Sequence, residues 1–164
     1  MKVLRTPESC FADLTDYPFA PHYHQVTGDL RLHYIDEGPR DAPVVLMLHG
    51  EPTWSYLYRH MIRLVAAAGL RVIAPDLIGF GKSDKPANRS DYSYAGQVAW
   101  IRYWIEAVDL TGITLVCQDW GSLIGLRLAA ESPERFARIL VGNGGLPTGE
   151  GSIPTAFRVW RAFS

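Results

Sequence analysis

The chain has 164 residues, of which 48% are hydrophobic and 20% are charged, as is usual for a single globular domain. Its formal net charge is −1 at pH 7, so the charge balance favours neither nucleic acid nor an anionic membrane as a partner. No apolar run is long enough to cross a bilayer, and no apolar stretch follows Lys2 and Arg5 as it would in a signal peptide. We therefore expect a cytoplasmic protein.

The first third of the chain predicts three strands. Residues 1–20 show no period, and we expect them to be irregular. Two strands, 22–26 and 30–37, are predicted around a turn at Gly28. The segment 44–48 is apolar throughout, which is typical of a strand buried on both faces of a parallel sheet.

The rest of the chain alternates helices and strands. Apolar residues three and four positions apart predict a helix over 55–68, with Gly69 as its end. Its apolar positions include Leu57, Met61, Leu64, Val65 and Ala68. The later elements are a strand at 71–74, a helix at 92–108, a strand at 114–118, a helix at 121–130 and a strand at 138–141. Such alternation predicts an α/β fold with a mostly parallel sheet flanked by helices.

The composition changes after Asn143, where glycine and proline become frequent and lead to an aromatic, helical segment at 156–163. The strand at 138–141 is apolar without alternation and has no further strand beside it. Natural proteins avoid exposing such an edge. We therefore expect that more chain belongs after Ser164.

The segment Cys117–Gly121 lies between a predicted buried strand and a helix. A nucleophile flanked by small residues at a strand-to-helix turn is the pattern of the hydrolase nucleophile elbow. Here the central residue is Asp119, whose carboxylate is already ionised at pH 7 and can displace a leaving group from a saturated carbon. The alternative is that Asp119 only caps the following helix.

A second element of the same pattern is His49–Pro52, which follows the buried strand 44–48. Gly50 allows the backbone to approach closely. Hydrolases of this kind build an oxyanion hole from the N–H group after such a strand and from that of the residue after the nucleophile. The predicted donors are the backbone N–H groups of Glu51 and Trp120.

Three motifs together resemble the haloalkane dehalogenases, which have the α/β-hydrolase fold: HGEPTWSYLYR at 49–59, PDLIGFGKSDKP at 75–86 and VCQDWGSLIGLRLA at 116–129. The similarity runs from about residue 20 to the last residues. It implies that this is an N-terminal portion of such a protein. Residues 1–143 would form the N-terminal part of the core domain. Residues 144–164 would be the start of a helical cap domain, and the fold would be truncated there.

The resemblance implies a role for each site residue. Asp119 would attack the halogen-bearing carbon and form an aspartyl ester, and the indole N–H of Trp120 would hold the departing halide. Trp160 would be the second halide-binding tryptophan, and Phe157 would be an apolar wall of the substrate pocket. Donors placed at the halogen favour the transition state because charge grows there as the bond breaks.

The resemblance also implies a histidine base and a carboxylate that orients it, both late in the chain. None of the five histidines lies beyond His60, so these 164 residues are not expected to complete a turnover. Two alternatives stay open: an epoxide hydrolase, which shares the elbow, and a non-catalytic hydrolase domain. The expected partners are a small apolar halogenated substrate, halide and water, and the complete protein is expected to be a monomer. No cofactor is expected, and His22 and His24 have no third ligand that would suggest a metal site.

Overall fold

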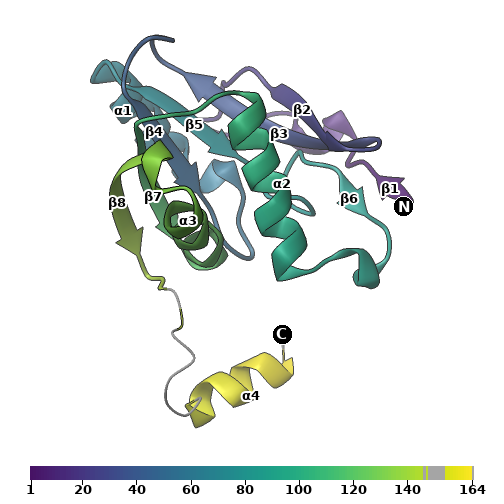
Figure 1. The fold of residues 1–164 in the computed structure, drawn as a ribbon. Coiled ribbons are helices and arrows are strands. Elements are labelled where there is room, and N and C mark those ends of the chain that lie inside the picture. Colours follow the sequence, from purple (N-terminus) through teal and green to yellow (C-terminus); the bar gives the residue numbers. More distant parts are fainter. Residues whose placement is uncertain (146, 148–153, 164) are drawn as a thin grey trace.

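The structure is a computed structural model that describes residues 1–145, 147 and 154–163, without the side chains of 160 and 161. Six strands form its central sheet (Figure 1). They are β2 (His22–Thr27), β3 (Leu30–Glu37), β4 (Val44–Leu48), β5 (Arg71–Pro75), β7 (Ile113–Gln118) and β8 (Phe136–Gly142), in the order β2-β3-β5-β4-β7-β8. β3 is antiparallel to both of its neighbours, whereas β5, β4, β7 and β8 are parallel. The predicted mostly parallel α/β sheet is confirmed.

The middle of the sheet positions the site. All five residues of β4 are buried, because this strand has a neighbour on each side and helices over both faces. In the register between β4 and β7, Leu48 lies opposite Cys117. Parallel strands end at the same edge of a sheet, so the segments that follow these two residues begin side by side.

Helices cover both faces of the sheet. On one face lie α2 (Tyr94–Ala107) and α3 (Trp120–Glu131), which share a core cluster with Leu46, Leu48 and Leu115. On the other face, α1 (Arg59–Ala67) packs through Ile62 against a second cluster from the same strands. The predicted helices are therefore confirmed, with small shifts at their ends.

The face that α1 buries differs from the predicted apolar positions. Three of those positions are exposed: Leu57, Met61 and Leu64. The first turn, Ser55–Tyr58, is a 3₁₀ helix, which winds more tightly than an α-helix. Polar bonds fix its orientation, because Ser55 N–H donates to Asp76 Oδ1 at 2.8 Å and Tyr58 Oη donates to Leu48 O at 2.9 Å. These anchors turn Ile62 inward.

The N-terminal segment is more ordered than the sequence predicts. A short strand, β1 (Val3–Leu4), pairs antiparallel with β6 (Lys85–Pro86), and a 3₁₀ turn follows at Glu8–Phe11. The expectation of an irregular segment over 1–20 is wrong at these places. Two-residue strands carry too little pattern to be recognised from sequence.

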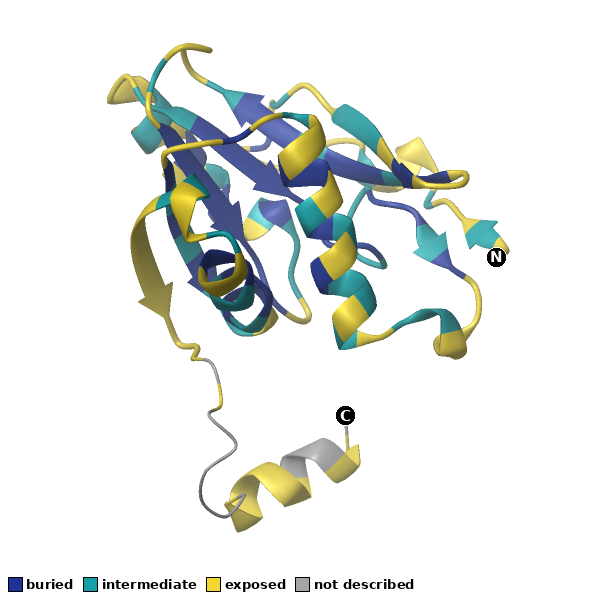
Figure 2. Ribbon diagram, viewed as in Figure 1, coloured by how far each residue is buried: buried dark blue, intermediate teal, exposed yellow. Residues whose placement is uncertain are grey.

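The edge strand β8 is exposed, as the sequence predicts. Ile139, Leu140 and Val141 of β8 are 40–58% accessible to solvent. Figure 2 shows this strand exposed beside the buried inner strands. Helix α4 (Thr155–Phe163) stands apart from the sheet (Figure 1). Within the described ranges, no helix is both long and apolar enough to span a membrane.

The corrected face of α1 gives a first prediction. Ile62→Ala should lower the free energy of unfolding by about 2–5 kcal/mol, because it opens a cavity in the core. Leu64→Ala on the same helix should change it by only about 0.5 kcal/mol, because that side chain is 72% exposed. Denaturant unfolding of both variants measures the difference. Equal losses would contradict the assigned face.

Candidate active site

Asp119 lies on a sharp turn between β7 and α3. Its backbone has φ 50° and ψ −126°, a conformation that L-residues rarely adopt. Its N–H donates to Asn143 O at 3.3 Å, and its carbonyl accepts Ser122 Oγ at 2.6 Å. The turn is therefore held from the end of β8 and from α3, as expected of a nucleophile elbow.

Close backbone approaches surround the turn. A Cβ atom on Gly121 would lie 2.1 Å from Leu48 O, and one on Gly50 would lie 2.3 Å from Asp119 Oδ1. A Cβ atom on Gly125 would lie 2.9 Å from Leu115 Cδ2. The first two positions admit only glycine without movement of the neighbouring chain. The predicted need for small residues around the elbow is thus confirmed.

The carboxylate of Asp119 is oriented by the segment after β4. Glu51 N–H donates to Asp119 Oδ1 at 2.9 Å. The side chain of Asp119 makes no capping hydrogen bond to α3, so the helix-cap alternative is wrong. One carboxylate oxygen is therefore held by a backbone donor, while Oδ2 accepts no hydrogen bond from the described residues.

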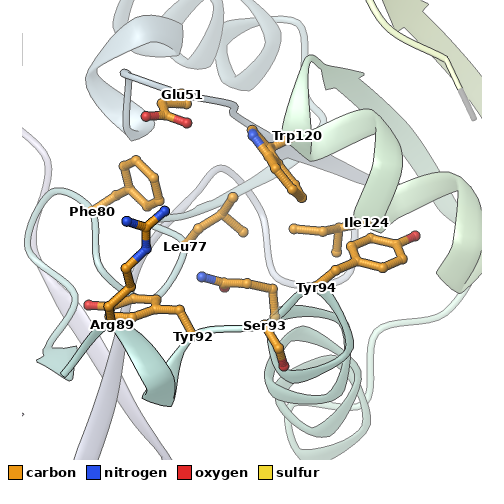
Figure 3. Close-up of a pocket in the computed structure, with 10 residues that line it drawn as sticks. Glu51, Leu77, Phe80, Arg89, Tyr92, Ser93, Tyr94, Trp120 and Ile124 are labelled. Carbon is orange, nitrogen blue, oxygen red and sulfur yellow. The ribbon is translucent and has the colours of Figure 1, made fainter. Parts of the chain in front are cut away.

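A cavity of about 470 Å³ opens beside the elbow and is lined by both polar and apolar residues. Its lining residues are Glu51, Leu77, Phe80, Arg89, Tyr92, Ser93, Tyr94, Gln97, Trp120 and Ile124. Figure 3 shows the indole of Trp120 projecting into this space toward Leu77 and Ile124. The cavity thus places the Trp120 ring and apolar walls beside Asp119, and it fits a small organic molecule.

Two tyrosines that line the cavity donate their hydroxyl groups to backbone carbonyl oxygens. Tyr92 Oη donates to Pro86 O at 3.1 Å, and Tyr94 Oη donates to Leu123 O at 2.7 Å. Neither proton is directed at the cavity. The Tyr94 ring lies 6.3 Å from that of Trp120 and supports it from the side.

The structure does not bring Phe157 to the cavity. Phe157 lies on α4 and is 47% exposed, and it is absent from the cavity lining. The side chain of Trp160 lies outside the described part of the structure. The roles predicted for these two residues therefore remain predictions.

His49 follows β4 directly, and both of its ring nitrogens are engaged. Leu77 N–H donates to Nε2 at 2.8 Å, and Nδ1 lies 3.0 Å from Gly50 O. Because a backbone N–H can only donate, Nε2 is unprotonated and Nδ1 carries the proton. Burial lowers the pKa of His49, which favours this neutral form. With both nitrogens bonded, His49 is not a general base for Asp119.

Sequence reasoning missed a buried polar network beneath this segment. Asp76 is fully buried and accepts three hydrogen bonds of 2.8 Å, from His33 Nδ1, Ser55 N–H and Lys82 N–H. Burial alone raises the pKa of a carboxyl, but the bond and charge of His33 hold the pKa of Asp76 below its ordinary value. His33 is buried within this network. The only sequence signal was an aspartate directly after a buried strand.

Comparisons with known proteins agree with this geometry. A profile of the alpha/beta hydrolase fold matches residues 43–162, and the chain belongs to that family. A haloalkane dehalogenase of Psychrobacter cryohalolentis is 60% identical to this chain, over the whole chain and 55% of the relative. Haloalkane dehalogenase 1 of Mycobacterium tuberculosis is also 60% identical, with 56% of its length covered. The predicted resemblance to haloalkane dehalogenases is confirmed.

Solved structures of haloalkane dehalogenases and of epoxide hydrolases both resemble the chain. A tetrameric haloalkane dehalogenase from Paraglaciecola agarilytica matches with a TM-score of 0.94 at 44% identity, over 99% of this chain and 56% of that one. An epoxide hydrolase from Vigna radiata matches with a TM-score of 0.74 at 29% identity, over 88% and 46%. The chain thus spans a little more than half the length of the curated relatives that it matches.

The close approach at the elbow gives a second prediction. Gly121→Ala should lower the free energy of unfolding by about 1–3 kcal/mol, because its Cβ atom overlaps the backbone carbonyl of Leu48. Gly142→Ala is the matched control, since its Cβ atom would meet nothing within 4 Å. Thermal unfolding followed by circular dichroism compares the two. A stable Gly121→Ala variant would show that helix and strand are not in contact.

Proposed function

We propose that this chain is the nucleophile-bearing part of an enzyme that hydrolyses haloalkanes to an alcohol and halide. The observation that carries the proposal is the 2.9 Å hydrogen bond from Glu51 N–H to Asp119 Oδ1. It fixes one oxygen of an elbow carboxylate and leaves Oδ2 for attack. The whole-chain similarity to haloalkane dehalogenases supports the same reaction.

The proposed reaction has two steps. In the first, Asp119 Oδ2 attacks the carbon, the carbon–halogen bond breaks, and the halide leaves with the bonding electrons. In the second, water gives a proton to the proposed base and attacks the carbonyl carbon of the aspartyl ester, and negative charge develops on Oδ1. The bond from this carbon to Oδ2 then breaks, the alcohol leaves with Oδ2 and takes up the proton, and the carboxylate is restored with an oxygen from water. Glu51 N–H already contacts this oxygen. The N–H of Trp120, at the first position of α3, has no acceptor within the helix and is the proposed second donor.

Halide departure calls for donors on the far side of the reacting carbon. We assign this role to the indole N–H of Trp120, because its ring projects into the cavity (Figure 3). Trp160 is the proposed second donor and Phe157 a proposed wall residue, which requires residues 144–164 to begin a cap that closes over the cavity. The histidine base and its acid partner are proposed to be supplied by sequence outside these 164 residues.

Epoxide hydrolysis would use the same elbow, but it needs an acid for the epoxide oxygen. Among the described residues that line the cavity, the tyrosines direct their hydroxyl protons to the backbone carbonyls of Pro86 and Leu123. Trp120 is a hydrogen-bond donor but a very weak acid. The cavity therefore favours a halide leaving group over an epoxide oxygen.

Alkylation of Asp119 tests the proposal, because the first step needs no base. Incubation with 1-bromobutane should add one butyl group to the chain, and peptide mapping should place it on Asp119. Without the base the ester should persist, since losing general-base catalysis typically costs about 10²–10⁴-fold. Intact mass spectrometry follows the adduct.

Asp119→Asn is the matched variant, since it keeps the shape of the side chain and removes its charge. It should remain unmodified while its melting temperature stays close to that of the unsubstituted chain. An unmodified parent chain after long incubation, or a butyl group elsewhere, would contradict the proposal. A hydroxybutyl adduct on Asp119 from epoxybutane, without any reaction with the bromoalkane, would favour the epoxide hydrolase instead.

The halide role of Trp120 has its own test. Trp120→Phe should slow butylation roughly tenfold, as expected for the loss of one donor to a developing anion. Trp100→Phe is the control, because Trp100 packs against the core and does not line the cavity. Equal rates in the two variants would remove Trp120 from the reaction.

A further inference from the structure

The peptide unit between Gly50 and Glu51 is bonded at both ends. Its carbonyl oxygen, on Gly50, lies within hydrogen-bond distance of three groups: Thr53 Oγ1 at 2.7 Å, Thr53 N–H at 2.9 Å and His49 Nδ1 at 3.0 Å. Its N–H, on Glu51, donates to Asp119 Oδ1 at 2.9 Å. A carbonyl oxygen with two lone pairs rarely accepts three donors, so this unit is held unusually firmly.

All three groups act as donors toward Gly50 O. The N–H of Thr53 can only donate, and its hydroxyl is directed at the same oxygen. His49 carries its proton on Nδ1, because Leu77 N–H occupies Nε2. The His49 ring is fully buried, so water does not compete for its two nitrogens.

Geometry links these donors to the nucleophile. In a planar trans peptide the C=O and N–H bonds point in opposite directions. Fixing Gly50 O therefore fixes the direction of Glu51 N–H, which faces Asp119. Donors on the oxygen also polarise the amide, since chains of hydrogen bonds strengthen one another.

From this arrangement we infer that Thr53 and His49 are positioning residues. They hold the Gly50–Glu51 peptide unit so that its N–H stabilises the negative charge that forms on Asp119 Oδ1 during ester cleavage. Neither residue touches the reacting atoms. The inference rests on the proposed function, because it requires an alkyl ester on Asp119.

The two chemical steps should respond differently. During alkylation the carboxylate loses negative charge, so a donor on Oδ1 gains nothing as the reaction proceeds. During ester cleavage negative charge appears on Oδ1, and the same donor becomes more effective. A weaker hold on the peptide should therefore slow ester cleavage and leave alkylation nearly unchanged. A merely structural role would not produce this split.

Hydroxylamine allows the second step to be measured in this chain without a histidine base. The chain is first butylated with 1-bromobutane, freed of reagent and treated with hydroxylamine at mildly alkaline pH. The nitrogen attacks the ester carbonyl carbon, and the bond to Oδ2 breaks. Butanol leaves after a proton passes from nitrogen to its oxygen, and a hydroxamate remains on Asp119. Intact mass spectrometry gives the rates of butylation and of hydroxamate formation separately.

The key variant is Thr53→Val, which keeps the backbone N–H and the shape but loses the hydroxyl donor. We expect hydroxamate formation to slow roughly tenfold, less than the 10²–10³-fold typical for loss of a whole oxyanion donor, with butylation changed less than about twofold. Thr53→Ser restores the hydroxyl and should restore the rate. Tyr56→Phe is the control in the same segment, since it loses only the exposed bond to Thr15 O.

The outcomes separate this inference from the proposed function. If the parent chain is not butylated on Asp119, the proposed function itself fails. If Thr53→Val is butylated and forms hydroxamate at the parent rate, the nucleophile assignment stands and the positioning role is wrong. If Thr53→Val loses its folded circular dichroism signal, Thr53→Ser and Thr53→Ala decide: Ser at the parent rate with Ala slowed supports the role, and equal rates overturn it.

Discussion

The contact between the end of β4 and the start of α3 is the constraint on which the site depends. Gly121 brings α3 so close to Leu48 that a Cβ atom would lie 2.1 Å from its carbonyl oxygen. Asp119 adopts a strained backbone conformation, with φ at 50°, where the chain turns from β7 into α3. Burial of all five residues of β4 offsets the cost of this strain. The core thus holds Asp119, the proposed nucleophile, in a conformation that an isolated turn would avoid.

Once the two segments are in contact, the site follows from ordinary backbone chemistry. Glu51 N–H reaches the carboxylate of Asp119, and the first N–H groups of α3 add the positive end of a helix dipole. Trp120 then projects into the cavity beside Asp119. The buried Asp76 network supports the same loop from below through Ser55. Much of the site is therefore built from main-chain groups, and side-chain identity matters at a few positions.

These facts explain which parts could be predicted from sequence. The parallel strands were predictable because burial on both faces leaves a continuous apolar run, as in residues 44–48. The elbow was predictable because strain and close approach require small residues around Asp119. The buried face of α1 was not, because hydrogen bonds of Ser55 and Tyr58 decide it. The Asp76 network was not, since a buried carboxylate has no periodic signal. The roles of Phe157 and Trp160 remain predictions, because α4 stands apart from the sheet (Figure 1).

The central claim is that Glu51 N–H holds the carboxylate of Asp119, and amide NMR tests it most directly. In the ¹H–¹⁵N spectrum, the Glu51 amide proton should resonate well downfield and be protected from exchange with solvent. Asp119→Asn should move it upfield, because a neutral amide oxygen is a weaker acceptor than a carboxylate, while amides of β4 stay in place. A Glu51 amide at an unstructured chemical shift, unmoved by the substitution, would contradict the account.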